Sequence, residues 1–339
     1  MTPPPVFSIA ALRLHHALAL LLGLWILGFA YQPSMAAEMS AGHASSSSSP
    51  QPHKHPKSVA SAQGRIQRSQ APAVSPVVPA AVARPRSAGR PDVRAGSYMV
   101  LDEHGAQVLA ASHEDKPAPI ASITKLMTAI VVLEAAQSLD ESMTIGPEEV
   151  RGTRGSASRL ASGTTLTRGE LLRLALMSSE NRAASSLCNQ YPGGKRACVA
   201  AMNAKAQALG MRTTRFVEPT GLSPQNVASP RDLAKLVMAA SANPRIADYS
   251  TTPKYTVTLR RQQAEFHNTN PLVKSRAWEI GLQKTGYIAE AGRCLVMRTV
   301  IDGRDVIIEL MNSWGTQTRF ADARRIRAWI EKRRPGLRA

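Results

Sequence analysis

The stretch Ala121-Ser122-Ile123-Thr124-Lys125-Leu126-Met127-Thr128-Ala129 is the one around which this 339-residue chain is organised. Apolar side chains recur at helical spacing over residues 126–133, which predicts a helix with one apolar face against a core. Ser122 lies at the N-terminus of this helix, and Lys125 follows on the same face one turn later. An amine in a dry site near other positive charge loses its proton more easily and can serve as a base for a hydroxyl. The stretch therefore predicts a serine nucleophile and its base at the start of a buried helix.

The Ser-x-x-Lys spacing is short and should occur by chance about once in a chain of this size. Taken alone, it is equally typical of an N-cap serine followed by a solvated lysine. Lys125 is, however, the only lysine in the chain that has a serine three residues before it. Other parts of the chain must supply the rest of a catalytic site.

Two further motifs lie where such a site would need them. Ser179-Glu180-Asn181 places a hydroxyl and an amide at a polar break between predicted helices. Lys284-Thr285-Gly286 places a cation and a hydroxyl at the end of a predicted strand, with a glycine that allows close approach of a substrate backbone. A second Ser-x-Asn at 241–243 precedes a proline and is typical of a helix stop, whereas Lys-Thr-Gly occurs once, which a random chain of this length would show less than about one time in ten. The three motifs in this order predict one serine nucleophile site.

Strand and helix patterns predict an α+β fold. Strands are expected at residues 97–102, 107–111, 256–259, 279–285, 294–301 and 305–310. Helices are expected from the nucleophile to about residue 137, after a Thr167 cap, over 202–209 and 232–240, and at 319–331, with a loop rich in Gly, Ser and Arg at 151–163. Because strands lie at both ends of the folded part and helices in its middle, we expect one sheet closed by the chain ends, with a helical insert.

The first 94 residues indicate export followed by a tether. A basic segment ending at His16 precedes an apolar stretch over 17–30, and small residues allow cleavage after Ala36 or Ala37, so residues 1–37 are a predicted signal peptide. The stretch is short for a membrane span, and an uncleaved anchor is the alternative. Residues 38–94 are rich in Ser, Pro, Ala and Arg without apolar periodicity, which predicts a disordered basic tether before a folded domain at 95–339.

The formal net charge of +18 predicts an anionic partner, either a nucleic acid, an anionic polymer or a membrane surface. Aromatic residues make up only 4% of the chain and are not interleaved with basic runs, which argues against a single-stranded nucleic-acid platform. An exported protein can keep a disulfide between Cys188 and Cys198, and Cys294 is then expected to be free and buried in a strand. No cluster of ligands surrounds any cysteine, so no metal site is expected.

At these motifs the chain resembles the penicillin-recognising serine acyltransferases, and more narrowly the low-molecular-mass penicillin-binding proteins of the D-alanyl-D-alanine endopeptidase type. The likeness covers roughly Ala95 to the C-terminus and also includes residues 216–224, 266–270 and 283–287. It implies a β-lactamase/transpeptidase-like fold, with an antiparallel five-stranded sheet, flanking helices and a helical lobe, and a site between the sheet and the lobe. It implies no cofactor.

The resemblance also implies catalytic roles. Ser122 would attack the carbonyl of a D-Ala residue and form an acyl-enzyme, Lys125 would accept the proton of Ser122, and Ser179 would relay a proton to the leaving amine.

Substrate-binding roles are implied as well. Asn181 would orient the substrate amide and Lys125, and Lys284 and Thr285 would hold a substrate carboxylate, with the charge of Lys284 lowering the Lys125 pKa. Gly286 would admit the substrate backbone, and the N–H group of Tyr287 would complete an oxyanion hole with that of Ser122.

The resemblance predicts cleavage of D-Ala–diaminopimelate cross-links in peptidoglycan, with β-lactams as covalent inhibitors and the periplasm as location. About 55 residues follow Lys284, too few for the second β-rich domain and amphipathic anchor of related carboxypeptidases, which favours an endopeptidase. A D-alanyl-D-alanine carboxypeptidase is the alternative. A serine β-lactamase is disfavoured because residues 218–222 do not match Glu-x-x-Leu-Asn, and a catalytically silent wall-binding protein is disfavoured by the intact Ser122 and Lys125. No nucleic-acid partner is expected, and membrane association only if the signal stays uncleaved.

Overall fold

The computed structural model describes residues 89–104 and 106–333. The predicted signal peptide and residues 38–88 of the predicted tether lie outside this part. Residues 89–94, which we assigned to the tether, are described and pack along the C-terminal helix. The indole Nε1 of Trp329 donates to the Gly89 carbonyl at 3.2 Å, and the Arg94 amide donates to the buried Asp322 carboxylate at 3.1 Å. The ordered domain therefore begins before residue 95.

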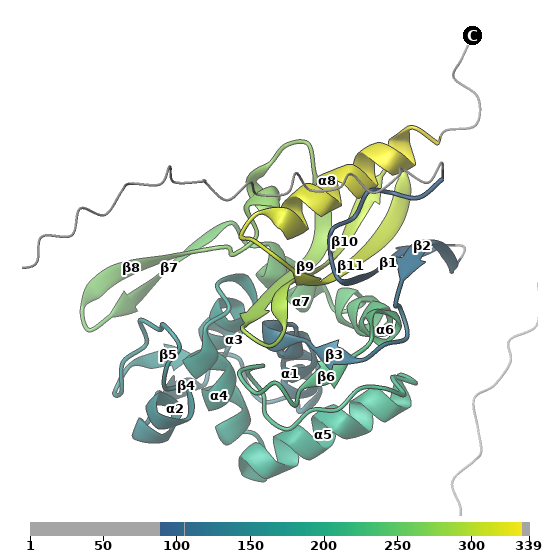
Figure 1. Ribbon diagram of the computed structural model, residues 1–339. Helices are drawn as coiled ribbons and strands as arrows, with labels where there is room; N and C mark the ends of the chain where they lie inside the picture. Colours follow the sequence, from purple (N-terminus) through teal and green to yellow (C-terminus); the bar gives the residue numbers. More distant parts are fainter. Residues whose placement is uncertain (1–88, 105, 334–339) are drawn as a thin grey trace, which may run out of the picture. The chain divides into compact units, whose positions relative to one another are not determined.

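A five-stranded antiparallel sheet joins the two ends of the domain, in the order β2-β1-β11-β10-β9 (Figure 1). The strands are β1 (Ser97–Asp102), β2 (Gln107–Ser112), β9 (Glu279–Ile288), β10 (Gly292–Ile301) and β11 (Arg304–Ser313). The pairing of β1 with β11, with Val100 opposite Ile308, closes the sheet as predicted from the positions of the strands. The predicted fold class is confirmed.

The two faces of the sheet carry two hydrophobic cores. On one face, α8 (Thr318–Glu331) buries Phe320, Ala323, Ile326 and Ile330 against β10 and β11. On the other face, α1 (Thr124–Glu134) and α6 (Pro230–Ser241) pack in the larger core (Figure 1). Helix α1 is buried on almost every side, and the short turn that precedes it, residues 121–123, packs against β9.

The remaining helices form the lobe in the middle of the chain. They are α2 (Pro147–Gly152), α3 (Arg168–Met177), α4 (Asn181–Asn189), α5 (Gly194–Ala208) and α7 (Pro244–Thr251). Thr167 caps α3 as predicted, since its hydroxyl accepts from the Glu170 amide at 3.1 Å. Short turns η1 (Ala121–Ile123) and η2 (Pro271–Lys274) precede α1 and β9.

Three local predictions in the lobe were incomplete. The helix expected over residues 202–209 is the second half of α5, which begins at Gly194. Residues 147–152, partly assigned to a loop, form α2, with Pro147 at its first position. The predicted stop at Ser241-Ala242-Asn243 does end α6, but Asn243 also begins α7 by accepting from the Arg245 amide at 3.0 Å. Proline is favoured at the first position of a helix, so the Asn-Pro pair serves as a stop and as a start.

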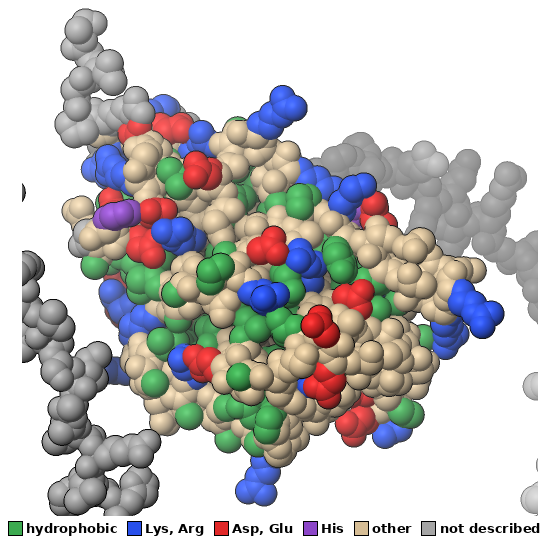
Figure 2. Space-filling view, turned by 180° about the vertical axis from the view of Figure 1, so that it is seen from behind, with side chains coloured by type: hydrophobic (Ala, Val, Ile, Leu, Met, Phe, Trp, Pro, Cys, Tyr) green, Lys and Arg blue, Asp and Glu red, His purple; other side chains and the backbone are tan. Residues whose placement is uncertain are grey.

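A hairpin of β7 (Lys254–Leu259) and β8 (Gln262–His267) projects from the domain as an arm (Figure 1). We predicted the first strand but not the second. Seen from behind, the arm ends in Lys or Arg side chains (Figure 2). Shorter pairs join β3 (Ala118–Pro119) to β6 (Val227–Ala228), and β4 (Ser142–Thr144) to β5 (Thr165–Thr167).

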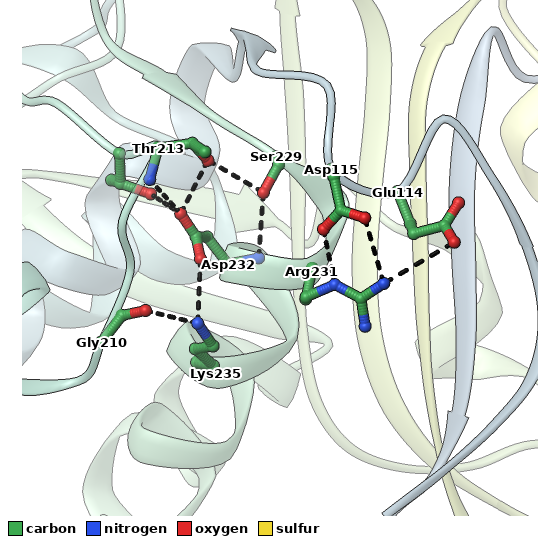
Figure 3. A network of polar contacts seen from close by, with 9 residues as sticks. Glu114, Asp115, Gly210, Thr213, Ser229, Arg231, Asp232 and Lys235 are labelled. Carbon is green, nitrogen blue, oxygen red and sulfur yellow. Dashed lines mark hydrogen bonds and ion pairs between the residues drawn. The ribbon is translucent and has the colours of Figure 1, made fainter.

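A polar network fixes the start of α6 (Figure 3). The Asp232 carboxylate accepts from the Thr213 amide at 2.8 Å and from Lys235 Nζ at 3.1 Å, and the pKa of Asp232 is lowered by these hydrogen bonds against the effect of burial. Next to it, Arg231 donates two hydrogen bonds to Asp115. The network connects the loop after α5, and the segment that contains Asp115, to the first turn of α6.

Cys188 and Cys198 are joined in a disulfide between α4 and α5, with a Cα–Cα distance of 5.4 Å. Cys294 is buried in β10, and burial raises the pKa of its thiol to about 11. Within residues 89–104 and 106–333, no group of three or more His, Cys, Asp or Glu side chains could hold a metal ion. None of the helices in the same part of the chain is both long and apolar enough to cross a membrane.

Candidate active site

The nucleophile turn places Ser122 one residue inside η1, directly before α1. Ala121 has a φ of +47°, a conformation that costs about 1–2 kcal/mol for a non-glycine residue and that clusters at functional sites. The Thr124 hydroxyl holds this turn by donating to the Ala121 carbonyl at 2.8 Å. The backbone of Ser122 is therefore fixed before any substrate arrives.

Two glycines clamp the nucleophile turn from opposite sides. Gly221 has a φ of +83°, and a Cβ there would lie 1.9 Å from the Ala121 carbonyl oxygen. Gly286 in β9 lies so close that a Cβ would be 2.9 Å from the Ile120 carbonyl oxygen and 3.2 Å from the Ser122 amide nitrogen. The Lys-Thr-Gly strand is thus packed directly against the turn that carries the serine.

Lys125 is buried and makes three short polar contacts. Its Nζ lies 2.8 Å from Ser122 Oγ, 2.7 Å from Asn181 Oδ1 and 2.6 Å from the Thr220 carbonyl oxygen. Burial lowers the pKa of Lys125 to about 7, although the carboxylates of Glu218 and Glu180 oppose the shift. We expected the charge of Lys284 to depress this pKa, but burial is the leading cause.

These three partners suit both protonation states of Lys125. As an ammonium ion it donates one proton to each of the three oxygens. As a neutral amine it can keep its two N–H groups on Asn181 Oδ1 and the Thr220 carbonyl oxygen, which can only accept, and turn its lone pair toward the Ser122 hydroxyl. The geometry therefore aims the basic position of the amine at the serine.

Lys284 is also fully buried but has a different environment. Its Nζ donates to Ser179 Oγ at 2.9 Å and to the Thr285 carbonyl at 2.8 Å. Burial, and after it the charges of Lys125 and Arg319, hold the pKa of Lys284 well below its usual range. An anion placed beside Lys284 would raise this pKa, so binding of a carboxylate and protonation of this lysine favour one another.

Thr285 and Ser179 complete this side of the site. The hydroxyls of Thr285 and Thr269 are 2.6 Å apart, and Thr269 is held by its amide, which donates to the Met177 carbonyl at 3.0 Å. Ser179 has a φ of +63°, a second strained non-glycine residue at the site. The hydroxyls of Ser179 and Thr285 and the amine of Lys284 therefore lie close together beside β9.

Arg319 supports β9 from the side of α8. Its Nη1 donates to the Gly286 carbonyl at 2.9 Å, and burial lowers its pKa to about 10. Tyr287, the next residue in β9, is 56% exposed, with the Arg293 guanidinium 4.4 Å from the centre of its ring.

The loop over residues 217–223 is held by two side chains. Glu218 accepts from the Thr220 amide at 2.7 Å and hydroxyl at 2.6 Å, and from the Gly221 amide at 2.6 Å. Buried Asn226 donates to the Glu218 carboxylate at 3.0 Å and to the Thr124 hydroxyl at 3.1 Å. Both carboxylate oxygens of Glu218 thus accept hydrogen bonds from its own loop. These bonds fix the position of the Thr220 carbonyl, which accepts a hydrogen bond from Lys125.

The structure brings the predicted site residues together around one point. Ser122, Lys125 and Asn181 are in direct contact, and Ser179 contacts Lys284. Sequence reasoning missed Thr269, Thr220 and Arg319, which contact predicted site residues through long-range pairs, and Asn226, which holds the 217–223 loop and Thr124. Only Thr220 and Thr269 lay within stretches that carried the family likeness. The Cys188–Cys198 disulfide lies further along α4 and does not touch the site.

Comparisons with known proteins find a family and relatives that match most of the chain. The family described as D-alanyl-D-alanine carboxypeptidase matches residues 84–315. The chain is 49% identical to a D-alanyl-D-alanine endopeptidase of Pseudomonas aeruginosa, over 73% of this chain and 81% of the relative. It is 47% identical to a protein of the same name from Escherichia coli, over 76% of this chain and 84% of the relative.

Solved structures of DD-transpeptidase and penicillin-binding type also match most of the chain. The Streptomyces K15 DD-transpeptidase is 28% identical with a TM-score of 0.67, over 71% of this chain and 98% of that one. An evolved penicillin-binding protein homologue from Mycobacterium tuberculosis is 26% identical with a TM-score of 0.66, over 73% of this chain and 95% of that one.

Proposed function

Because this chain belongs to the D-alanyl-D-alanine carboxypeptidase family, and within it to the low-molecular-mass penicillin-binding type, we propose that it hydrolyses peptidoglycan peptides through an acyl-enzyme on Ser122. The observation that carries this proposal is the set of contacts around Lys125, which point a buried amine with a pKa of about 7 at the Ser122 hydroxyl. A group with a pKa near the working pH is the most effective general base.

Acylation proceeds from the neutral state of Lys125. The Ser122 hydroxyl gives its proton to Lys125 as its oxygen attacks the carbonyl carbon of D-Ala. The tetrahedral intermediate then collapses and the C–N bond breaks as Ser179 donates a proton to the leaving amine. The proton that Lys125 took from Ser122 replaces the one lost by Ser179, and Lys125 returns to its neutral state. Water later attacks the ester, and the acid is released with Ser122 restored.

Binding groups on β9 and α4 position the substrate in this proposal. Lys284 and Thr285 hold the carboxylate next to the leaving amine, and Asn181 orients the substrate amide. Gly286 lets the substrate backbone run beside β9. The amides of Ser122 and Tyr287 receive the developing oxyanion, and the close packing of Gly286 on the Ser122 amide supports this role.

Cleavage of D-Ala–diaminopimelate cross-links is the principal activity we propose, because the relatives at 47–49% identity carry the name endopeptidase. Carboxypeptidase activity is the second candidate, since the family description and more distant relatives carry that name. Fast β-lactam hydrolysis is disfavoured because Glu218 is engaged by its own loop and has no free oxygen to activate water.

The relatives are bacterial cell-wall enzymes, and we propose that this protein is exported to the periplasm, with its signal peptide cleaved after Ala36 or Ala37. Peptidoglycan is then the substrate and β-lactams are covalent inhibitors. The basic tether would hold the enzyme against an anionic polymer, and membrane association would follow only if the signal remained.

Chromatography of two purified substrates tests the principal activity. Cross-linked muropeptide dimers should be converted to monomers, while monomeric pentapeptides should release little D-Ala in the same time. Ser122→Ala is the control and should leave both substrates unchanged. Rapid D-Ala release with intact dimers would overturn the endopeptidase proposal and leave the carboxypeptidase.

A further inference from the structure

We propose that three arginines, Arg159, Arg260 and Arg261, form a cationic surface that binds the carboxylates of the leaving peptide stem of a cross-link. We call these three residues the arginine rim. The inference rests on the proposed function and deepens it, since it names the part of the substrate that distinguishes a cross-link from a terminal D-Ala.

The arm begins at the carboxylate-binding end of the site. Thr269 follows β8 by two residues, and its hydroxyl lies 2.6 Å from that of Thr285. In the proposed mechanism, Lys284 and Thr285 hold the carboxylate next to the leaving amine. The chain attached to that amine therefore leaves the site beside the arm.

Arg159 lies between the catalytic motif and the arm. Its amide donates to the Glu180 carboxylate at 3.3 Å, and the neighbouring Ser158 hydroxyl donates to the same carboxylate at 2.6 Å. Its guanidinium stacks on Phe266 of β8, 3.6 Å from the ring centre, and the residue is exposed. Phe266 precedes Thr269 by three residues, about 10 Å along an extended chain, within the reach of a stem peptide that extends about 3.5 Å per residue.

The tip of the arm has an unusual composition for its shape. Leu259 pairs with Gln262, so Arg260 and Arg261 form a two-residue turn, with φ of +46° and +69°. Such turns favour Asn-Gly or Asp-Gly, because a side chain at positive φ costs about 1–2 kcal/mol. The hairpin of β10 and β11 follows the rule, with Asp302 at +56° and Gly303 at +72°. The arm tip thus has two charged arginines at positions with positive φ, where Asn and Gly would be less strained.

The charge of the rim is not neutralised within the described part of the chain. No ion pair joins Arg159, Arg260 or Arg261 to a carboxylate there; Arg260 donates to the Ser162 carbonyl at 3.3 Å. Glu265, the acidic residue of β8, pairs with Lys254 at 3.0 Å and His267 at 3.4 Å. The arm tip therefore presents positive charge to solvent, as Figure 2 shows at its end.

The leaving stem of a cross-link is the occupant that matches this charge. A terminal D-Ala has a single carboxylate, which Lys284 and Thr285 would hold. A stem peptide brings further carboxylates outward from the site, in the direction of the arm. Guanidinium groups bind carboxylates in a bidentate way, which suits such a partner. The rim would contribute to cross-link cleavage and little to D-Ala release.

The test uses two variants. The first is Arg159→Ala, and the second carries both Arg260→Asn and Arg261→Gly, which give the turn its preferred residues and keep the hairpin. Arg324→Ala, an exposed arginine on α8 behind the sheet, is the matched control. For each variant, kcat/KM for dimer cleavage is divided by the rate of acylation by penicillin. This ratio should fall about fivefold for Arg159→Ala and about two- to threefold for the double change, and stay at the wild-type value for Arg324→Ala.

A second substrate isolates the carboxylates. In these dimers, the leaving-stem carboxylates other than the one beside the scissile amine are amidated. The wild type should cleave them about fivefold more slowly than free dimers. The triple variant, which combines Arg159→Ala with Arg260→Asn and Arg261→Gly, should cleave both substrates at one rate. An equal preference in the triple variant and the wild type would overturn the inference alone. Failure of the wild type to cleave dimers, with penicillin acylation intact, would overturn the endopeptidase proposal and the inference together.

Discussion

Lys125 and Lys284 are the two fully buried lysines in the described part of the chain, and their partners differ. Lys125 has three oxygen acceptors, one of which is the Ser122 hydroxyl. Lys284 has a hydroxyl and a carbonyl, and the positive charges of Lys125 and Arg319 lie near it. The first arrangement satisfies the lysine within the protein, whereas the second leaves an amine that gains from an incoming anion. In the proposed mechanism, the same residue type would thus act as a base in one place and as a carboxylate receptor in the other.

Removing the base should have the largest effect. Lys125→Ala leaves Ser122 without a proton acceptor, so the rate of acylation by penicillin should fall by about 10³-fold or more. Stopped-flow or gel-based labelling measures this rate. Lys125→Arg is the control for charge, because it fills the space but stays protonated, and it should be equally inactive. Acylation within about tenfold of the wild type in either variant would refute the role of Lys125.

Removing the receptor should have a smaller effect that depends on the substrate. Lys284→Ala should lower kcat/KM by about 10²-fold for a peptide with a free carboxylate beside the scissile bond, since a buried charge pair is lost. The corresponding amide substrate, which is already poor, should lose less than about threefold. An equal loss on both substrates would mean that Lys284 acts on the chemistry and not on the carboxylate.

The pH dependence of acylation should separate the two lysines. Since the pKa of Lys125 is about 7, the neutral base becomes available above that pH, and the acylation rate should rise through about pH 7. Asn181→Asp places a carboxylate 2.7 Å from Lys125 Nζ and should move the rise upward by about one to three pH units. A profile that is unchanged in Asn181→Asp would assign the titration to another group.

Glu309 is a third buried ionisable group and differs from both lysines because its carboxylate has no hydrogen-bond partner among the described residues. Both oxygens of Glu309, on the central strand β11, lack a hydrogen bond, and burial raises its pKa well above the usual range. The folded state therefore holds this proton more tightly than the unfolded state. The associated stability is complete below about pH 4 and is lost as the pH rises through the folded pKa.

Glu309→Gln should therefore flatten the dependence of unfolding free energy on pH above about pH 5, an effect of about 1–2 kcal/mol. Urea titrations at several pH values measure it. Glu290→Gln, on the turn between β9 and β10, is the exposed control and should follow the wild-type curve. An unchanged slope in Glu309→Gln would show that this carboxyl does not carry the pH dependence.

Sequence patterns predicted the sheet, the nucleophile helix and the three motifs, because each depends on local periodicity or on residues close in sequence. The positions of Thr269 and Arg319 could not be predicted in this way. Thr269 reaches Thr285 through the packing of an arm, and Arg319 reaches Gly286 across the sheet from α8.

The positive φ values of Ala121 and Ser179 could not be predicted from the sequence either. Neither residue type favours that conformation, and only the surrounding packing imposes it. The missed helix α7 had a local signal, the Asn-Pro pair, which we assigned only to a helix end.

The central claim is that Ser122 is the nucleophile, and mass spectrometry of the protein after incubation with a penicillin tests it most directly. The intact mass should increase by one penicillin, and the adduct should map to the peptide that contains Ser122. Ser122→Ala, at the same concentration and time, should show no adduct. An adduct on another residue, or one that persists in Ser122→Ala, would contradict the account.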